Sequence, residues 1–420
     1  MGFRIISPPH IMYLMESVAV FGLGYVGLPL AQLTKSKGFA VVGVDVSESA
    51  LKRARGVGVE VSSDGVSAVR KAEIVVVCVP TPVDNKYMPD LEAIVSVCET
   101  IAGGLRKGQL VVVESTINPG VMEEVVKPIL EKSGLKAGKD FFLAHCPERI
   151  DPGNRKWNVS NLPRVVGGID KESTRRAAEF YRKIIDAPVL ELSSVKAAEA
   201  TKIMENAFRD VNIAFVNEMA KSFDNLGIDI TEVIKAASTK PFAFMPHYPG
   251  CGVGGHCIPV DPYYLIEEAK RKGFNHRFLL LAREINNSMP EYTVQKVVDA
   301  LNEVGLSAKG SRICVLGVAY KRDVDDVRES PSLKIIEKLQ KLGGKVEVYD
   351  PFIPSKSTLK SLDDCFKCDS LVLVTDHSEF VNMDLSKLGK VKVIVDGRNC
   401  LDREKIRSLG VVYRGIGRGD

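Results

Sequence analysis

Residues 17–30 read SVAVFGLGYVGLPL, a short apolar run followed by three glycines in the spacing GxGxxG. The run predicts a buried strand over residues 17–22, and the residues after it predict a helix over 25–37. A glycine-rich turn between a strand and a helix brings backbone N–H groups and the positive end of the helix dipole to a phosphate. The stretch therefore predicts the first βα unit of a dinucleotide-binding α/β sheet.

The glycines and an acid about 20 residues later define the expected cofactor site. Gly22 allows the tight turn, Gly24 lets the backbone approach a pyrophosphate, and Gly27 lets helix and strand pack closely. Asp45 would accept hydrogen bonds from ribose hydroxyls and repel a 2′-phosphate, which favours NAD over NADP. The alternative is a packing turn with a surface aspartate. The residues expected to bind NAD are Gly22, Gly24, Tyr25, Val26, Gly27, Asp45, Pro80, Thr81 and Thr116.

Apolar runs rich in β-branched residues continue through the first half of the chain, with helical stretches between them. They predict buried strands of a parallel βαβ sheet. The further strands expected there are 40–46, 73–79, 109–114, 141–145, 161–168 and 186–193. Thr81 and Thr116 follow two of these strands, at the carboxyl edge where ligands bind in open α/β sheets. For Thr116, a plain turn residue before Pro119 is the alternative.

The pattern of apolar residues changes at about residue 195. Apolar residues recur at three- and four-residue steps over 195–226, which predicts one amphipathic helix of roughly 45 Å. Helical texture continues to about residue 303, and a second alternating section follows. Its expected strands are 312–318, 345–349, 370–375 and 391–396.

The predicted fold is α/β, with two Rossmann-like, doubly wound parallel-sheet domains joined by a central long-helix domain. The expected domains are an NAD-binding domain over 1–194, a central helical domain over 195–303 and a second Rossmann-like domain over 304–420. A helix as long as 195–226 joins two domains or packs against its twin in a dimer.

The 420-residue chain has a globular composition, with 45% hydrophobic and 26% charged residues. Its formal charge of +4 is slight and its cations are scattered, which gives no basis for a nucleic-acid partner. The sequence lacks an apolar run of about 18 residues and the layout of a signal peptide, so no membrane span and a cytoplasmic location are expected. Met15, just before the first predicted strand, is an alternative start to Met1.

Nine cysteines, an odd number spread along the chain, do not have the pattern of a disulfide framework. Most lie in apolar runs and are expected to be core residues. Cys365 and Cys368 form a lone CxxC without a second pair at zinc-finger spacing, and no ligand cluster surrounds Cys257. No metal site is therefore predicted.

Residues 250–257 read GCGVGGHC, a glycine-dense loop that ends in a cysteine. The glycines permit positive φ and remove side chains, so the backbone can press against a flat or anionic ligand. Asp261-Pro262 resembles a helix start with Asp261 as the N-cap; alternatively, Asp261 shares a helix face with Cys257. A helix N-terminus lowers the pKa of a thiol and makes it a nucleophile, whereas the alternative is a buried structural cysteine.

An NAD site together with a nucleophilic cysteine suggests oxidation through a thioester. The thiolate would trap an aldehyde as a thiohemiacetal, a second oxidation would give the thioester, and water would release an acid. This scheme needs hydrogen-bond donors near the developing oxyanion. Lys202 and Asn206, on one helix face with Glu199, could supply them; solvated helix residues are the alternative.

Several longer motifs occur in the order found in one family. They are VPTP, ESTINPG, CPER, AEATKIMEN, GCGVGGHCIPVDPYYL, AREINNSMP, LGVAYKRDVDDVRESP, VTDHSEF and DGRN. Across residues 17–418 the chain resembles the UDP-glucose/GDP-mannose 6-dehydrogenase family. Within that family it is most similar to the UDP-N-acetyl-D-mannosamine 6-dehydrogenase branch, on CPERIDPG, HCIPVDPYYL, AREINNSMP and the terminal GIGRG.

The resemblance implies catalytic roles. Cys257 would be the catalytic thiol, with Lys202 and Asn206 stabilising oxyanion-like intermediates. Asp261 would assist proton transfer, Thr116 would hold a water, and Glu148 could act as base in thioester hydrolysis. The UDP-glucose branch has a second acid four residues after that glutamate, whereas this chain has Pro152, so the activation of the hydrolytic water is open.

The resemblance also implies the partners: a UDP-sugar, bound by the C-terminal domain, and a second copy of the chain along the long helix, with a higher oligomer left open. The residues expected to bind the substrate are Glu148, Arg149, Ile150, Lys202, Asn206, Gly254, Gly255, Lys321, Arg328 and Arg398. UDP-N-acetyl-D-mannosamine, UDP-N-acetylglucosamine and UDP-glucose remain open as substrates. The product is expected to enter a surface polysaccharide or glycan.

Two rival functions fit parts of the pattern. A two-electron dehydrogenase of the 6-phosphogluconate type also pairs a Rossmann domain with long helices, but it needs neither the cysteine loop nor a second α/β domain. A non-catalytic nucleotide-sugar sensor would not need the set of Lys202, Asn206, Cys257 and Asp261.

Overall fold

The computed structural model describes residues 16–83, 89–150, 154, 156–255 and 257–419. They fall into two compact units, which divide between Lys202 and Ile203. Helix α7 (Val195–Leu226) is continuous across that point, as the apolar periodicity predicts. The division into three domains stays a prediction.

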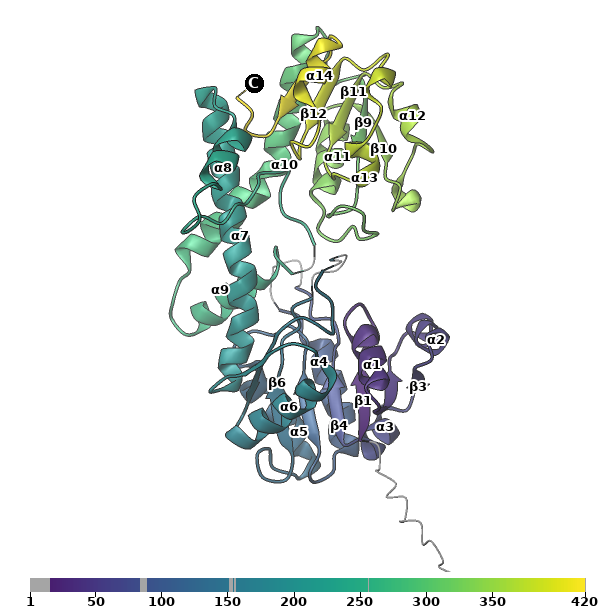
Figure 1. The fold of residues 1–420 in the computed structure, drawn as a ribbon, viewed down its shortest axis with the longest axis vertical. Helices are drawn as coiled ribbons and strands as arrows, with labels where there is room; N and C mark the ends of the chain where they lie inside the picture. Colours follow the sequence, from purple (N-terminus) through teal and green to yellow (C-terminus); the bar gives the residue numbers. More distant parts are fainter. Residues whose placement is uncertain (1–15, 84–88, 151–153, 155, 256, 420) are drawn as a thin grey trace, which may run out of the picture. The chain divides into compact units, whose positions relative to one another are not determined.

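The first unit is built on an eight-stranded sheet of order β3-β2-β1-β4-β5-β6-β7-β8 (Figure 1). Its first six strands follow the 3-2-1-4-5-6 order of dinucleotide-binding domains. The strands are β1 (Ser17–Phe21), β2 (Ala40–Val44), β3 (Glu60–Ser62), β4 (Ile74–Val77), β5 (Leu110–Val113), β6 (Phe142–His145), β7 (Arg164–Gly168) and β8 (Val189–Glu191). All the strands predicted for this half are present, and β3 was not predicted.

Helices cover both faces of this sheet because its strands are apolar on both sides. One core cluster joins the sheet to α1 (Gly27–Ser36), α2 (Glu48–Gly56) and α6 (Lys171–Ile184). The other face carries α3 (Gly65–Lys71), α4 (Glu92–Gly104), the π-helical turn Met122–Val126 and α5 (Lys127–Leu130). A 3₁₀ turn, Glu131–Ser133, follows α5.

One pair of neighbouring strands departs from the parallel pattern: β7 runs antiparallel to β6, with His145 opposite Gly167. A parallel connection needs a crossover of about a dozen residues, usually through a helix. The described residues between 146 and 163 contain no helix, so the chain returns in the opposite direction. The consequence is that the first residue of β7 lies at the carboxyl edge of β6.

The second unit has a five-stranded, all-parallel sheet of order β10-β9-β11-β12-β13. Its strands are β9 (Arg312–Leu316), β10 (Lys345–Tyr349), β11 (Ser370–Leu373), β12 (Val393–Asp396) and β13 (Val412–Gly415). The four predicted strands are present, and β13 was not predicted. The order 2-1-3-4-5 is doubly wound, with its switch point between β9 and β11.

Helices of the second unit cover both faces of this sheet and extend beyond it. Besides the rest of α7 they are α8 (Ile230–Ala237), α9 (Asp261–Arg271), α10 (Arg277–Glu303), α11 (Pro331–Lys341), α12 (Leu362–Cys365), α13 (Ser378–Val381) and α14 (Arg403–Ser408), with 3₁₀ turns at Pro354–Lys356 and Leu385–Lys387. Helices α10 and α11 cover one face and α12, α13 and α14 the other. The predicted fold class is confirmed. Within the described parts of the chain, none of the helices is long and apolar enough to cross a membrane.

Candidate functional site

The glycine turn after β1 has the geometry of a pyrophosphate cradle. Gly22 has a φ of +87°, and a Cβ there would lie 2.5 Å from the carbonyl oxygen of Cys78. A Cβ on Gly27 would lie 1.8 Å from the carbonyl oxygen of Gly22, so α1 can start here only with glycine. Gly24 has no atom within 4 Å of its Cβ position, which leaves that face of the turn open. Tyr25 is exposed and Val26 is half-buried beside it.

Asp45 follows β2 at the same edge of the sheet. Its carboxylate accepts hydrogen bonds from the N–H groups of Leu23 (2.7 Å) and Ser47 (2.8 Å). The side chain is therefore fixed beside the glycine turn, and Asp45 stays partly exposed. An oriented carboxylate at this position suits the ribose hydroxyls of NAD, so the residues of the turn fit that cofactor.

The loops after β4 and β5 are joined at this edge. The Thr81 hydroxyl donates a hydrogen bond of 2.6 Å to the carbonyl oxygen of Thr116. Pro80 is exposed, Thr81 is buried and Thr116 is half-buried. The structure thus brings these three predicted residues together at the carboxyl ends of neighbouring strands.

Glu148 lies in the loop after β6, where both carboxylate oxygens have donors. Oε1 accepts the N–H groups of Arg149 (2.5 Å) and Ile150 (2.6 Å), and Oε2 accepts Nη1 of Arg164 (2.8 Å). Arg164 is completely buried and was not predicted as a site residue. The sequence signal that could have found it is a charged residue within a predicted apolar strand. Pro152 lies outside the described residues.

Glu199 has a structural role at the start of α7. Its carboxylate accepts the N–H groups of Gly120 (2.7 Å) and Met122 (2.8 Å) and thereby holds the loop that follows Thr116. Burial raises the pKa of Glu199 to about 7, against these two hydrogen bonds, which lower it. Lys202, one turn later on the same helix, is 8% exposed.

In the second unit the structure brings Asn206, Cys257 and Asp261 into one region. The carbonyl oxygen of Cys257 accepts the N–H groups of Val260 (3.1 Å) and Asp261 (2.8 Å), which turns the chain into α9. Asp261 is 1% exposed, and its carboxylate accepts Nδ2 of Asn206 at 2.5 Å. The Cys257 thiol is half-buried and lies just before the N-terminus of α9.

The N-cap interpretation of Asp261 is wrong. Val260 is the N-cap residue, and Asp261 is the first helical residue, with Pro262 next. The Asp261 side chain is committed to Asn206 instead of capping the helix. A cap needs a side chain that turns back onto its own helix, whereas this carboxylate turns to α7.

The glycines before Cys257 leave room for residues 320–329 to pack against the loop. A Cβ on Gly254 would lie 2.8 Å from the Cβ of Tyr320, and one on Gly255 would lie 2.8 Å from the ring of Tyr320. The N–H of Gly255 donates to the carbonyl oxygen of Arg328 at 2.9 Å. The glycine-dense loop is therefore required for packing against residues 320–329, and the expected contact of Gly254 and Gly255 with a sugar stays a prediction.

Cations gather at the carboxyl edge of the second sheet. Arg398 Nε lies 3.2 Å from Asp376 Oδ1, and Arg322 Nη2 lies 2.5 Å from Asp376 Oδ2. Burial raises the pKa of Asp376, but the two guanidinium groups outweigh it and hold the pKa below its ordinary value. Arg328 pairs with Asp326 at 2.7 Å. Arg322 was not predicted as a site residue, although it follows the predicted Lys321 directly in the sequence.

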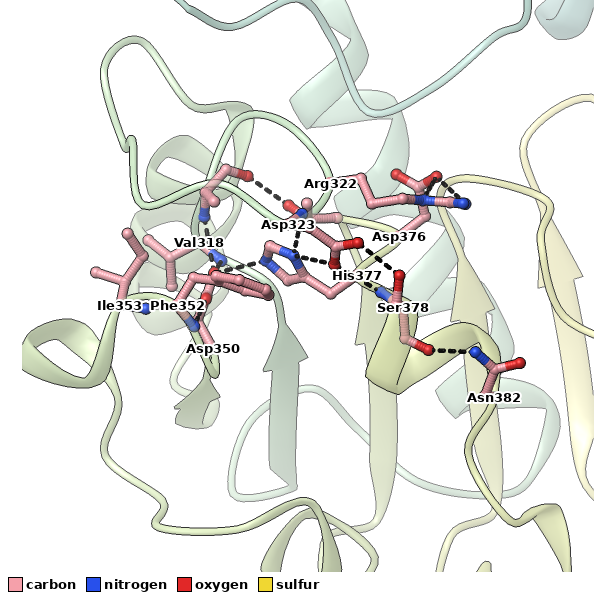
Figure 2. A network of polar contacts seen from close by, with 12 residues as sticks. Val318, Arg322, Asp323, Asp350, Phe352, Ile353, Asp376, His377, Ser378 and Asn382 are labelled. Atoms are coloured by element: carbon pink, nitrogen blue, oxygen red, sulfur yellow. Dashed lines mark hydrogen bonds and ion pairs between the residues drawn. The ribbon is translucent and has the colours of Figure 1, made fainter. Parts of the chain in front are cut away.

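A polar network lies at the switch point of the second sheet (Figure 2). Asp350, after β10, accepts the N–H groups of Val318 (2.6 Å) and Ala319 (2.9 Å) and contacts His377 Nε2 at 3.1 Å. The other ring nitrogen of His377 accepts the N–H of Asp323 at 2.8 Å. The network fixes the loop that carries Arg322. Within the described ranges, no group of three or more His, Cys, Asp or Glu residues could hold a metal ion.

Comparisons with known proteins cover almost the whole chain. Models of the UDP-glucose/GDP-mannose dehydrogenase family match as its NAD binding domain over residues 16–57 and 48–185, its central domain over 196–288 and its UDP binding domain over 314–403. The UDP-N-acetyl-D-mannosamine dehydrogenase of Pyrococcus horikoshii is 35% identical, over 96% of this chain and 99% of its own. The UDP-N-acetyl-D-glucosamine 6-dehydrogenase of Pseudomonas aeruginosa is 37% identical, over 92% of this chain and 98% of its own.

Solved structures agree with these matches. The UDP-D-ManNAc dehydrogenase structure from Pyrococcus horikoshii superposes with a TM-score of 0.88 at 35% identity, over 96% of this chain and all of that one. A UDP-glucose dehydrogenase from Pyrobaculum islandicum gives a TM-score of 0.85 at 27% identity, over 98% and 99% of the two chains. The chain therefore belongs to the UDP-glucose/GDP-mannose dehydrogenase family and is an NAD-dependent dehydrogenase of that family.

Proposed function

We propose that this enzyme oxidises the C6 alcohol of UDP-N-acetyl-D-mannosamine to the carboxylate in two successive two-electron steps. The observation that carries the proposal is the turn at Cys257, which places a half-buried thiol just before a helix N-terminus, with Asp261 hydrogen-bonded to Asn206. The helix dipole favours the thiolate, which is the nucleophilic form. NAD, held by the Gly22 turn and Asp45, accepts two electrons in each oxidation.

The residues of the chain act on the carbon that is oxidised. The thiolate of Cys257 adds to the C6 aldehyde, and Lys202 and Asn206 stabilise the oxyanion of the thiohemiacetal. Oxidation of that adduct gives a thioester, whose carbonyl oxygen uses the same donors. Asp261 exchanges the proton of the thiol, and Thr116 holds a water.

Hydrolysis completes the reaction. Glu148 takes a proton from water, the hydroxide oxygen bonds to the thioester carbon, and the carbon–sulfur bond breaks with its electron pair on Cys257 Sγ. One water and two NAD are consumed for each alcohol converted to acid. Arg149, Ile150, Gly254, Gly255, Lys321, Arg328 and Arg398 are proposed to bind the substrate.

A substrate panel tests the choice of sugar. UDP-N-acetyl-D-mannosamine, UDP-N-acetylglucosamine and UDP-glucose are supplied with NAD, and NADH release is followed together with the product. We expect the highest kcat/KM with UDP-N-acetyl-D-mannosamine and two NADH per sugar. UDP-N-acetylglucosamine is the second candidate, because the relative from Pseudomonas aeruginosa named for it is 37% identical. One NADH per sugar with an aldehyde product would overturn the four-electron scheme.

Replacement of the thiol tests the mechanism. Cys257→Ala is expected to lower acid formation by at least a thousandfold, because no thioester can form. Cys257→Ser is the conservative comparison, and we expect it to retain an ester-linked sugar that intact-mass spectrometry detects. Cys400→Ala is the matched control at another half-buried cysteine, with unchanged kinetics expected. Acid formation by Cys257→Ala at the wild-type rate would refute the nucleophile.

We also propose that the chain forms a homodimer along α7. Met204, Phe208 and Phe215 on this helix are 67%, 44% and 55% exposed, which is unusual for large apolar side chains of a single copy. Light scattering is expected to give twice the mass of the 45.9 kDa chain. Phe208→Glu with Phe215→Glu should lower that mass to that of one chain. The cytoplasmic location stays a prediction.

A further inference from the structure

Two carboxyl groups and one guanidinium meet at the carboxyl edge of the first sheet. Glu114 follows β5, Glu148 follows β6, and Arg164 is the first residue of β7. Because β7 is antiparallel to β6, its first residue faces the loop that carries Glu148. A parallel strand would have placed this cation at the opposite edge of the sheet.

One guanidinium nitrogen contacts both acids. Arg164 Nη1 lies 2.8 Å from Glu148 Oε2 and 3.6 Å from Glu114 Oε2. Glu114 and Arg164 are completely buried, whereas the Glu148 side chain is 10% exposed. Glu148 is therefore the member of the group that water can reach.

The other contacts hold Glu114 in place. The Tyr181 hydroxyl donates to Glu114 Oε1 at 2.5 Å, and the Arg164 guanidinium lies 5.9 Å from the centre of the Tyr181 ring. Burial raises the pKa of the Glu114 carboxyl; Arg164 opposes this, and the adjacent Glu148 raises it further. The protonation of Glu114 therefore depends on the charges of its two neighbours.

Two thiols and a phenol are also buried against the pair. Cys78 and Cys146 are buried against it, and burial raises the pKa of both thiols, as it does that of the Tyr181 hydroxyl. These three groups stay neutral near pH 7. The buried charged groups of the cluster are therefore Glu114, Glu148 and Arg164, and the half-buried Arg149 is a neighbouring cation, with Nη1 2.9 Å from the carbonyl oxygen of Pro163.

We propose that Glu114 and Arg164 are positioning residues for hydrolysis, and that Glu114 is the second carboxyl of a pair that accepts the proton Glu148 takes from water. The inference rests on the proposed function. With both carboxyls ionised, the group carries one net negative charge, and uptake of one proton makes it neutral. The hydroxide oxygen then bonds to the thioester carbon, and the carbon–sulfur electron pair returns to Cys257.

The test measures kcat between pH 5.5 and 9.5 with NAD and UDP-N-acetyl-D-mannosamine. Glu114→Gln removes a negative charge, so we expect the acidic limb of the profile to move down by about one pH unit or more. Arg164→Met removes the cation, so the limb is expected to move up by a similar amount. Arg164→Lys keeps the charge but replaces the planar guanidinium, whose Nη1 contacts both acids, by a flexible ammonium. Its limb is expected to stay in place while kcat falls roughly tenfold or more and a thioester accumulates on Cys257.

Controls keep the result falsifiable. Arg182→Met removes an arginine on α6 that pairs with Glu191 at the surface, and it should match wild type in kcat and limb position. If Arg164→Met does not fold, Glu114→Gln and Arg164→Lys decide the outcome. Two results would overturn this inference alone, provided that the wild type turns over normally. One is that the acidic limb of the kcat profile does not move in Glu114→Gln and Arg164→Met. The other is that Arg164→Lys is slow but accumulates no thioester on Cys257. Absence of wild-type turnover with each sugar of the panel overturns the proposed function together with it.

Discussion

The glycine turns at Gly22 and Gly317, one in each sheet, are built alike. Each has a left-handed glycine, with φ of +87° and +91°, directly after the first strand of its sheet. Gly22 donates its N–H to Val44 at 2.8 Å, and Gly317 donates to Tyr349 at 2.9 Å. The two sheets therefore share one local backbone design at their switch points.

The acids next to these turns differ in what they contact. Asp45 accepts the N–H of Leu23 at 2.7 Å, and Asp350 accepts that of Val318 at 2.6 Å. Asp45 is partly exposed, but Asp350 is 1% exposed and also contacts His377 (Figure 2). The same position thus carries a partly exposed carboxylate, which we propose binds a ribose of NAD, in one sheet and a buried structural acceptor in the other.

Loss of the buried acid is expected to have the largest effect. Asp350→Ala removes the acceptor of four backbone N–H groups and of a buried histidine, which costs about 3–5 kcal/mol of unfolding free energy. Hydrogen exchange followed by mass spectrometry should show faster exchange in β9 and β11 and unchanged exchange in β1 and β4. The dissociation constant of NAD should not change.

Asp64→Ala is the matched control for this prediction. Asp64 caps α3 in the first unit through the N–H of Ser67, at 2.9 Å. Its loss should cost about 1 kcal/mol and leave β9 and β11 unaffected. Equal exchange in β9 and β11 for wild type and Asp350→Ala would contradict the structural role of Asp350.

The sequence predicts local features of both sheets well. The β-branched runs and the apolar steps over 195–226 are signals of single elements, and the helix and strands expected from them are confirmed. The short strands β3 and β13 carry weaker signals, a single valine in β3 and only Val412-Tyr413 in β13. The reversal at β7 arises because the described residues between β6 and β7 contain no helix. Hydrophobic periodicity reveals single helices and strands but not the direction in which a strand pairs.

The functional sites were predicted as residue types but not as contacts. Cys257 and Asp261 lie close in sequence and could be paired from spacing alone. By contrast, Tyr320 against Gly255 and Arg164 against Glu114 join residues 65 and 50 positions apart. Only the tertiary fold brings such pairs together, so motif reading finds the members but not their partners.

The pH dependence of stability gives an intermediate effect. Burial raises the pKa of Asp350, but His377 and the two N–H groups outweigh it and lower the pKa from 3.8 to about 2. The stabilisation is therefore present above pH 4 and is lost as the pH falls toward 2, by about 2 kcal/mol. Asp350→Asn removes this titration. Hydrogen exchange in β9 is measured at pH 5, 4 and 3 and corrected for the intrinsic exchange rate at each pH. The corrected rate should rise toward pH 3 in wild type and change less in the variant. Equal pH dependence in the two proteins would refute the role of Asp350.

The smallest effect is expected at the exposed acid. Asp45→Ala should weaken NAD binding about tenfold, or about 1.4 kcal/mol, because the ribose loses a charged acceptor while the freed N–H of the exposed Ser47 can turn to water. Titration calorimetry gives the dissociation constant, and hydrogen exchange in β1 and β2 should match wild type. Asp64→Ala, an acid of the same unit outside the turn, should leave NAD binding unchanged. Much faster hydrogen exchange in β1 and β2 of Asp45→Ala would mean that Asp45 is a structural acceptor like Asp350. The two acids would then have the same role, and the two sheets would differ only in the ligands that they bind.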